Sequence, residues 1–229
     1  MSKTPKFNTV SGAYIYSLAI LRLYDWWVLT ISNRFAWQCP TKSVLLPFFQ
    51  KYLRRSHLDI GVGTGYYLAR SALPHDQEIT LLDLNGNSLK MARDRISSLN
   101  PCLVREDILN PGNQLEGRMF DSISLFYLLH CLPGAMSEKM KATLDFLLHH
   151  LAPNGVIYGA TILGEETNHN WLGSRLIGLY NKKGIFDNRH DSRVDLEAAL
   201  RDRFLEVEVQ VHGKVALFSA RMPKRMFGT

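Results

Sequence analysis

The chain has 229 residues, of which 46% are apolar, 10% aromatic and 21% charged, and this composition excludes a disordered chain. Its 27 basic and 21 acidic side chains leave a net charge of +6, which permits an anionic partner without requiring one. Cys39, Cys102 and Cys131 are odd in number and lack C-x-x-C spacing, so a disulfide scaffold or a zinc cluster is not expected and a reducing compartment is favoured.

The N-terminal region is expected to be helical and rich in aromatic rings. One or two helices are predicted over residues 12–37, and Pro40 marks their end because the residue before a proline avoids helical angles. Thr41 is expected to cap a following helix over residues 42–52, whose leucine and phenylalanine side chains share one face.

A long apolar stretch over residues 13–31 is not expected to cross a membrane. Arg22 and Asp25 lie near its middle, and two charges at that depth would cost several kcal/mol. No A-x-A-like cleavage site is present where a signal peptide would need one. We therefore expect a cytoplasmic protein without a membrane partner.

From residue 57 onward, short apolar runs alternate with helical stretches. Strands are predicted over 57–60, 79–82, from 103, and over 121–126, 156–162, 206–211 and 215–221, with helices over 66–72, 88–99, 139–151 and 194–203. This alternation predicts an α/β fold with a mostly parallel sheet that is covered by helices on both faces. The last two strands are antiparallel neighbours if their link at Gly213 is a tight hairpin. Residues 165–190 interrupt the alternation and form an expected insert.

The strongest local signal is a glycine-rich loop between the first predicted strand and the helix after it. The loop has glycine at every second position and an aspartate two residues before the first glycine: Asp59, Gly61, Gly63 and Gly65. Glycine lets the backbone turn sharply and leaves no side chain between the main chain and a ligand. Ligands of open α/β sheets bind at the carboxyl ends of the strands, which is where this loop lies. The loop therefore predicts a nucleotide or nucleoside site.

The spacing of the loop differs from the dinucleotide fingerprint. That fingerprint, G-x-G-x-x-G, would place its third glycine at position 66, where this chain has Tyr66. Asp59 is also an unfavourable neighbour for a pyrophosphate, whereas its carboxylate suits an ammonium group. Asp83 ends the second predicted strand and can accept hydrogen bonds from both hydroxyls of a ribose. A ribose and an ammonium without phosphate describe S-adenosylmethionine rather than NAD.

These two motifs resemble those of the class I S-adenosylmethionine-dependent methyltransferases, and the resemblance covers about residues 55–221. It implies a Rossmann-like sheet of seven strands, six parallel and the last antiparallel. It also implies a methyltransferase domain over residues 55–229, preceded by an N-terminal helical lid over residues 1–54. Residues 180–186 are similar to a stretch that recurs in a small-molecule branch of the family.

The resemblance also implies a role for each motif residue in binding S-adenosylmethionine. The glycine loop with Asp59 would bind the methionine side, Asp83 would be the ribose acid, and Leu84 would pack on the adenine. Asn85, in the same motif, is also expected to bind the cofactor. Asp107 and Ile108 follow the third strand, where an acid and a backbone amide bind the adenine amino group in this family. Phe126, at the end of the fourth strand, would face the methionine moiety and the substrate.

Methyl transfer from a sulfonium is an in-line displacement, so the main task of the protein is to position the two reactants. A general base helps only where the acceptor loses a proton, and His130 is the candidate because it follows the fourth strand. The alternative is that His130 holds the loop in which it lies. No metal site is expected, because Asp121 and Asp145 do not form a visible acid cluster.

Two aromatic segments are expected to cover the substrate. In small-molecule methyltransferases an N-terminal extension lies over the cofactor as a lid, and Tyr24 and Trp37 are our candidates for pocket residues there. The insert over residues 165–190 falls at the same rim and is expected to close the acceptor pocket.

The favoured hypothesis is an enzyme that methylates a small-molecule substrate. One alternative is an RNA or protein methyltransferase, suggested by the net charge and by the basic pair Lys182 and Lys183; a nucleic-acid partner is not favoured, because the basic residues are scattered. The other alternative is a non-catalytic subunit that binds the cofactor. The sequence does not predict the oligomeric state.

Overall fold

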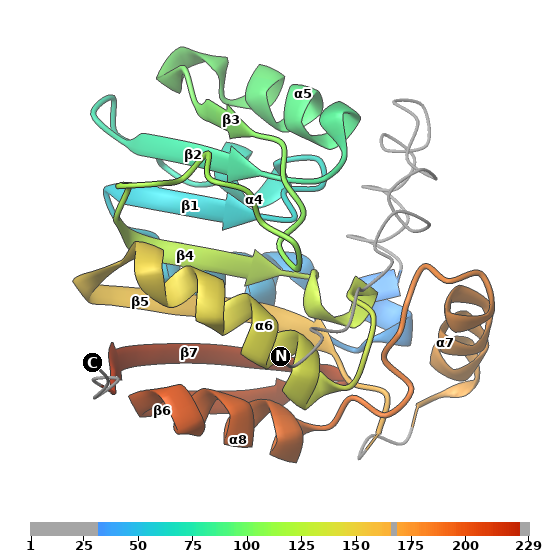
Figure 1. Cartoon of the computed structure of the whole chain (residues 1–229). Helices are drawn as coiled ribbons and strands as arrows, with labels where there is room; N and C mark the ends of the chain where they lie inside the picture. The colour runs from blue at the N-terminus through green and yellow to red at the C-terminus, as the bar shows by residue number, and fades with distance from the viewer. Residues whose placement is uncertain (1–31, 166–168, 225–229) are drawn as a thin grey trace.

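The computed structural model describes residues 32–165 and 169–224, and its centre is a sheet of seven strands in the order β3-β2-β1-β4-β5-β7-β6 (Figure 1). The strands are β1 (Ser56–Ile60), β2 (Glu78–Leu82), β3 (Cys102–Val104), β4 (Phe120–Phe126), β5 (Leu151–Ile162), β6 (Phe204–His212) and β7 (Val215–Pro223). Strands β1 to β5 pair in parallel, and β7 lies antiparallel between β5 and β6. The predicted sheet and its C-terminal hairpin are thereby confirmed.

Helices cover both faces of the sheet (Figure 1). The α-helices are α3 (Leu46–Tyr52), α4 (Tyr66–Ala69), α5 (Gly86–Arg95), α6 (Met136–Leu147), α7 (Trp171–Lys182) and α8 (Arg193–Arg203). Shorter helical turns are η2 (Thr41–Leu45), η3 (Ser97–Leu99), η4 (Leu129–Cys131) and η5 (Leu148–His150). None of the helices in these described ranges is long and apolar enough to cross a membrane.

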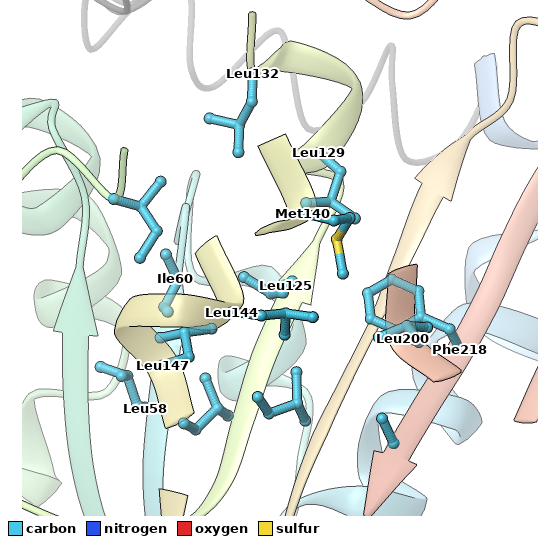
Figure 2. Packing of buried hydrophobic residues seen from close by; sticks show 14 of the residues in the cluster. Leu58, Ile60, Leu125, Leu129, Leu132, Met140, Leu144, Leu147, Leu200 and Phe218 are labelled. Carbon is cyan, nitrogen blue, oxygen red and sulfur yellow. The ribbon is translucent and has the colours of Figure 1, made fainter. Parts of the chain in front are cut away.

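The first face of the sheet is covered by α6 and α8. Leu147 of α6 lies near Leu58 of β1, and Leu144 of the same helix lies near Leu125 of β4 (Figure 2). Leu200 of α8 lies beside Phe218 of β7, and all of these side chains are fully buried. Burial of each such side chain contributes about 1.5–3 kcal/mol, so this apolar layer fixes the two helices on the sheet.

The opposite face is covered by α3, α4 and α5, and its centre is aromatic. The Phe49 ring of α3 lies 5.7 Å from the Tyr158 ring of β5 and 5.1 Å from the Phe126 ring of β4. Helix α3, at the end of the predicted lid, therefore packs on the sheet, while residues 1–31 of that lid lie outside the described residues. The domain boundary at residue 54 stays a prediction.

The predicted cap at Thr41 is wrong. Pro40 occupies the position before the first helical turn, and the Thr41 hydroxyl instead accepts a hydrogen bond of 2.8 Å from the Asn33 side-chain amide. The predicted helix over residues 42–52 also divides into η2 and α3. Pro47 lies in the first turn of α3, where its missing N–H does least harm, because it cannot donate to the preceding turn.

Several other boundaries differ from the prediction. Helix α5 begins at residue 86 because the Asn85 side chain accepts the Asn87 backbone N–H at 2.9 Å and thereby caps it. Helix α6 begins three residues earlier than expected and ends at Leu147. Strand β5 extends back to Leu151, and residues 152–155 bulge out of its pairing with β4.

The fold places the carboxyl ends of β1, β2 and β4 at one edge of the sheet. The glycine loop follows β1, Asp83 follows β2, and residues 127–132 follow β4. Helix α7 stands beyond this same edge, at the right of Figure 1. The segments that the sequence analysis singles out therefore meet at one end of the molecule.

Candidate functional site

All three glycines of the loop have a positive φ, between 52° and 71°, a conformation that other residues adopt only with strain. A Cβ on Gly61 would lie 2.8 Å from the Leu128 side chain, and one on Gly65 would lie 2.7 Å from the Cα of Ala92. A Cβ on Gly63 would meet no atom of residues 32–165 or 169–224 within 4 Å. Gly61 and Gly65 thus allow close packing within the fold, whereas at Gly63 the bend of the main chain faces open space.

Asp83 lies beside this bend and accepts hydrogen bonds from its backbone amides. Its Oδ1 accepts the Asn85 backbone N–H at 2.8 Å, and the Val62 and Gly63 amides also hydrogen-bond to the carboxylate. Burial raises the pKa of Asp83 to about 6, and these amide hydrogen bonds limit the rise. The structure therefore brings Asp83 together with the glycine loop, with part of the residue still exposed.

Asp59 lies inside the sheet rather than on the surface of the loop. It is 6% exposed, and its Oδ1 lies 2.5 Å from the Ser124 hydroxyl of β4. Burial and, to a smaller extent, the nearby charge of Asp83 raise the pKa of Asp59 to about 7, against the lowering effect of the Ser124 hydrogen bond. The two carboxyl groups are therefore near enough to interact.

A buried polar network continues from Asp59 to the start of β1. The His57 ring lies with Nε2 3.2 Å from the Ser124 hydroxyl and with Nδ1 2.8 Å from the Ser122 hydroxyl. Burial lowers the pKa of His57 to about 3, so the ring is neutral and carries one N–H. With Asp59 ionised, Ser124 donates to the carboxylate and accepts from Nε2, and Ser122 donates to Nδ1.

This network was not found from the sequence, although a signal for it exists. His57 and Asp59 alternate along β1, and Ser122 and Ser124 alternate along β4 in direct register with them. Two polar residues at matching alternate positions of neighbouring buried strands indicate a shared polar network, because side chains two apart point to the same face.

Asp59→Asn is expected to stabilise the fold above neutral pH. The pKa of Asp59 is raised to about 7 in the folded chain, whereas the pKa of an aspartate in an unfolded chain is about 3.9. At pH 8 the wild type therefore keeps an ionised carboxylate in its interior. This cost decreases as the pH falls below the folded pKa and is gone near the unfolded pKa.

The difference in unfolding free energy between Asp59→Asn and wild type should therefore be larger at pH 8 than at pH 4, in favour of the variant, by on the order of 3 kcal/mol. Urea titration of both proteins at the two pH values measures this gain. A difference in stability that stays constant with pH would contradict an interior ionisation.

The other residues expected near the nucleoside follow β2 and β3. Leu84 is partly exposed next to Asp83, and the Asn85 side chain caps α5. Asp107 forms a turn in which Oδ1 accepts the Leu109 backbone N–H at 3.0 Å, and the Ile108 side chain is buried in the core. The structure thus places this group around the same edge, with Asn85 and Asp107 also shaping the local backbone.

Phe126 packs inward at the end of β4. Its ring lies 4.9 Å from the Tyr67 ring and 5.1 Å from the Phe49 ring, and the residue is 5% exposed. The next residue, Tyr127, has a φ of 57° and donates its backbone N–H to the Ala160 carbonyl at 2.8 Å. A tyrosine in the left-handed backbone conformation is strained. Such strain tends to occur at functional sites, and it cannot be predicted from the sequence.

His130 is buried, with 1% of its surface exposed, and its ring is engaged by β5. Nδ1 accepts the Ile162 backbone N–H at 3.3 Å, and the ring meets the Phe186 ring edge-on at 4.5 Å. Burial and, to a smaller extent, the charge of Lys139 lower the pKa of His130 to about 3. This geometry favours the alternative role of holding the loop over that of a general base, because the unprotonated nitrogen is already occupied.

Of the two expected lid residues, Tyr24 lies outside the described residues, and Trp37 packs against the insert. Trp37 is 1% exposed, and its ring centroid lies 6.2 Å from that of His169 and 6.3 Å from that of Phe186. Its carbonyl accepts the Lys214 backbone N–H at 2.8 Å. Trp37 therefore joins the N-terminal region, the insert and the C-terminal hairpin.

The insert consists of α7 and the segment that returns from it to α8. Its inner side contributes Leu176 and the pair Tyr180 and Phe186, whose rings lie 4.9 Å apart. Its outer side carries Trp171, which is 69% exposed with the Arg175 guanidinium over its ring. Over residues 32–165 and 169–224, no group of three or more His, Cys, Asp or Glu side chains is placed to hold a metal ion.

Residues 58–157 match a family model described as a methyltransferase domain. The chain is 39% identical to the physcion biosynthesis cluster O-methyltransferase of Aspergillus chevalieri, over 96% of this chain and 99% of that protein. It is also 39% identical to the N-methyltransferase vrtF of Penicillium aethiopicum, over 82% of this chain and 78% of that protein.

Among solved structures, the fold resembles the N-methyltransferase NodS from Bradyrhizobium japonicum in complex with S-adenosyl-L-homocysteine. The TM-score is 0.56 at 16% sequence identity, and the match covers 79% of this chain and 85% of that chain. Sequence similarity over nearly the whole length and the seven-stranded sheet with its antiparallel β7 agree. The chain belongs to the class I S-adenosylmethionine-dependent methyltransferases.

Proposed function

We propose that this chain transfers the methyl group of S-adenosylmethionine to an oxygen or nitrogen atom of a small secondary metabolite. The observation that carries the proposal is the exposed main-chain bend at Gly63, whose backbone amide hydrogen-bonds to the Asp83 carboxylate at the carboxyl ends of the strands. The names of the relatives support an O- or N-methyl acceptor of this class. Unpaired Cys39, Cys102 and Cys131 support a cytoplasmic location.

The residues at the edge of the sheet fit the cofactor. An open main-chain bend lets a nucleoside approach the backbone of Gly63, and Asp83 supplies acceptor oxygens for its ribose hydroxyls. Asp59 lies beneath the loop, where a negative charge offsets a cationic ligand. When bound, S-adenosylmethionine supplies an activated methyl group and a good leaving group.

The contribution of the chain to the reaction is to position the acceptor and to exclude water. The segment after β4 and the insert meet through His130 and Phe186, at the edge of the sheet where the glycine loop lies. A cover at this place would hold the acceptor atom in line with the methyl group at about 3–3.5 Å. Apolar rings such as Tyr180 also suit a planar, largely apolar acceptor.

The test is turnover of methyl-labelled S-adenosylmethionine with a panel of phenols, carboxylic acids and aromatic amines. We expect label in at least one small acceptor and none in bulk RNA or in denatured protein. Label transferred to RNA or protein with no small acceptor in the panel would contradict the proposal, as would binding of the cofactor without any turnover.

His130→Asn is expected to leave the pH dependence of turnover unchanged. The asparagine Oδ1 replaces Nδ1 as acceptor of the Ile162 N–H, so the loop keeps its anchor. Because burial lowers the pKa of His130 to about 3, the ring does not titrate between pH 5 and pH 9. The measurement is kcat against pH with an acceptor from the phenol panel, and loss of an inflection near pH 6.5 in the variant would restore the general-base role.

A further inference from the structure

Lys139, in the first turns of α6, is fully buried, which is rare for a lysine. Its ammonium donates to the Asp191 Oδ2 at 2.8 Å, to the Asp187 carbonyl at 2.8 Å and to the Leu132 carbonyl at 3.3 Å. Asp191 is itself buried, at 3% exposure of its side chain. All three donors of the ammonium are thereby used.

These acceptors come from two separate parts of the candidate site. Leu132 ends the turn that follows β4, whereas Asp187 and Asp191 belong to the segment that returns from α7 to α8. The same two parts are joined by the Asp187 backbone N–H, which donates to the His130 carbonyl at 2.9 Å. The Gly134 N–H also donates to the Asp187 carboxylate at 2.9 Å.

The two ends of the insert are joined at this point as well. The backbone N–H groups of Gly164 and Glu165 donate to the Asp191 carbonyl, at 3.0 and 3.1 Å. The Asn188 side-chain amide donates to the Ile162 carbonyl at 3.0 Å. A Cβ on Gly164 would lie only 1.9 Å from the Asn188 carbonyl oxygen, so the backbone after β5 is in direct contact with the segment that leads to α8.

A buried ion pair is a poor way to gain stability alone. Removing two charges from water costs several kcal/mol, and apolar residues of similar volume often stabilise a fold equally well. Three hydrogen bonds from one ammonium do, however, require a defined geometry of their acceptors, which an apolar contact does not require. Through the Asp187 carbonyl, this ammonium connects the loop after β4 to the segment that returns from α7, the helix that stands beyond the end of β4 in Figure 1.

We propose that Lys139 is a positioning residue that fixes the segment over residues 183–191, which returns from α7 to α8, to the loop after β4 and so sets the geometry of the acceptor side of the site. This inference rests on the proposed function, because it assigns the acceptor to the space that the insert covers. The burial of Lys139 could not be predicted from the sequence, since a lysine at the start of a helix is normally solvated.

The test compares Lys139→Met with the double variant Lys139→Met/Asp191→Leu, which removes both buried charges and so keeps a foldable core. Lys141→Met is the matched control, because Lys141 lies on the same helix and pairs with Asp145 at 2.7 Å in an exposed position. Three quantities are measured: amide hydrogen exchange by mass spectrometry, affinity for S-adenosylhomocysteine by calorimetry, and kcat and KM for S-adenosylmethionine with an acceptor from the phenol panel.

In the double variant we expect amides over residues 183–191 to exchange at least tenfold faster, while those of β1 and β4 stay within twofold of wild type. Affinity for S-adenosylhomocysteine should change less than threefold, and kcat should fall at least tenfold with little change in KM for S-adenosylmethionine. The control should match wild type throughout. If Lys139→Met alone does not fold, the double variant carries the test.

Two outcomes would overturn the assignment. Wild-type exchange over residues 183–191 in the double variant would show that the ion pair does not hold the insert. Equal acceleration of all amides, β1 and β4 included, would show a general structural role. A wild-type chain that binds no S-adenosylhomocysteine would instead refute the proposed function, and the exchange comparison would still decide the role of Lys139.

Discussion

Asp83→Ala is expected to weaken the binding of S-adenosylhomocysteine by at least about a hundredfold. Two hydrogen bonds from ribose hydroxyls to a carboxylate contribute about 1.5–3 kcal/mol each, and about 1.4 kcal/mol corresponds to a tenfold change in affinity. Calorimetry on the full chain measures the effect. Asp94→Ala is the matched control, because Asp94 is an exposed acid on α5 that pairs only with its neighbour Arg93 among the ion pairs of the described residues.

The same carboxylate predicts how binding depends on pH. Burial raises the pKa of Asp83 to about 6, so the group loses its charge as the pH falls through that value. The affinity for S-adenosylhomocysteine should therefore fall between pH 8 and pH 5 in the wild type, and this dependence should be smaller in Asp83→Asn. Wild-type affinity in a folded Asp83→Ala protein would contradict the assignment of the ribose acid.

Gly65→Ala is expected to lower the unfolding free energy by about 3 kcal/mol or more, whereas Gly63→Ala should lower it by only about 1 kcal/mol. Both residues have a positive φ, which costs alanine about 1 kcal/mol. At Gly65 the added methyl would also lie 2.7 Å from the Cα of Ala92, and the backbone cannot move aside as a flexible side chain would. Urea titration of the two variants measures the difference.

Among the folded variants, Gly63→Ala should be the more stable protein but should bind S-adenosylhomocysteine more weakly than Gly65→Ala. A methyl on Gly63 points into open space, which the proposed cofactor occupies, so Gly63→Ala should lose affinity for S-adenosylhomocysteine while it keeps most of its stability. A Gly63→Ala protein with wild-type affinity would place the ligand elsewhere. Equal stability losses in the two variants would contradict the packing at Ala92.

The parts of the site that the sequence could predict are local in the chain. The glycine loop and Asp83 lie at the ends of consecutive strands, so alternation of apolar runs was enough to bring them to one edge. The sheet followed from the same alternation, and the C-terminal hairpin from its short link at Gly213.

The parts that escaped prediction depend on contacts between distant residues. The Ser124 contact of Asp59 needs the register of β1 against β4, and the burial of Lys139 needs the return of the insert to α6. Thr41 has the residue type of a helix cap, but a tertiary hydrogen bond from Asn33 uses its hydroxyl instead. In each case a long-range contact overrides a local preference, which pattern alone does not reveal.

The most direct measurement is a titration of the full chain with S-adenosylmethionine and, separately, with NADH. A main-chain bend open at Gly63 and bonded to a carboxylate should bind the sulfonium nucleoside in a one-to-one complex, with a rise in melting temperature that grows with ligand concentration. It should show no saturable binding of NADH, since a carboxylate beneath the loop opposes a pyrophosphate. Saturable binding of NADH with no heat or thermal shift from S-adenosylmethionine would contradict the assignment of this edge of the sheet.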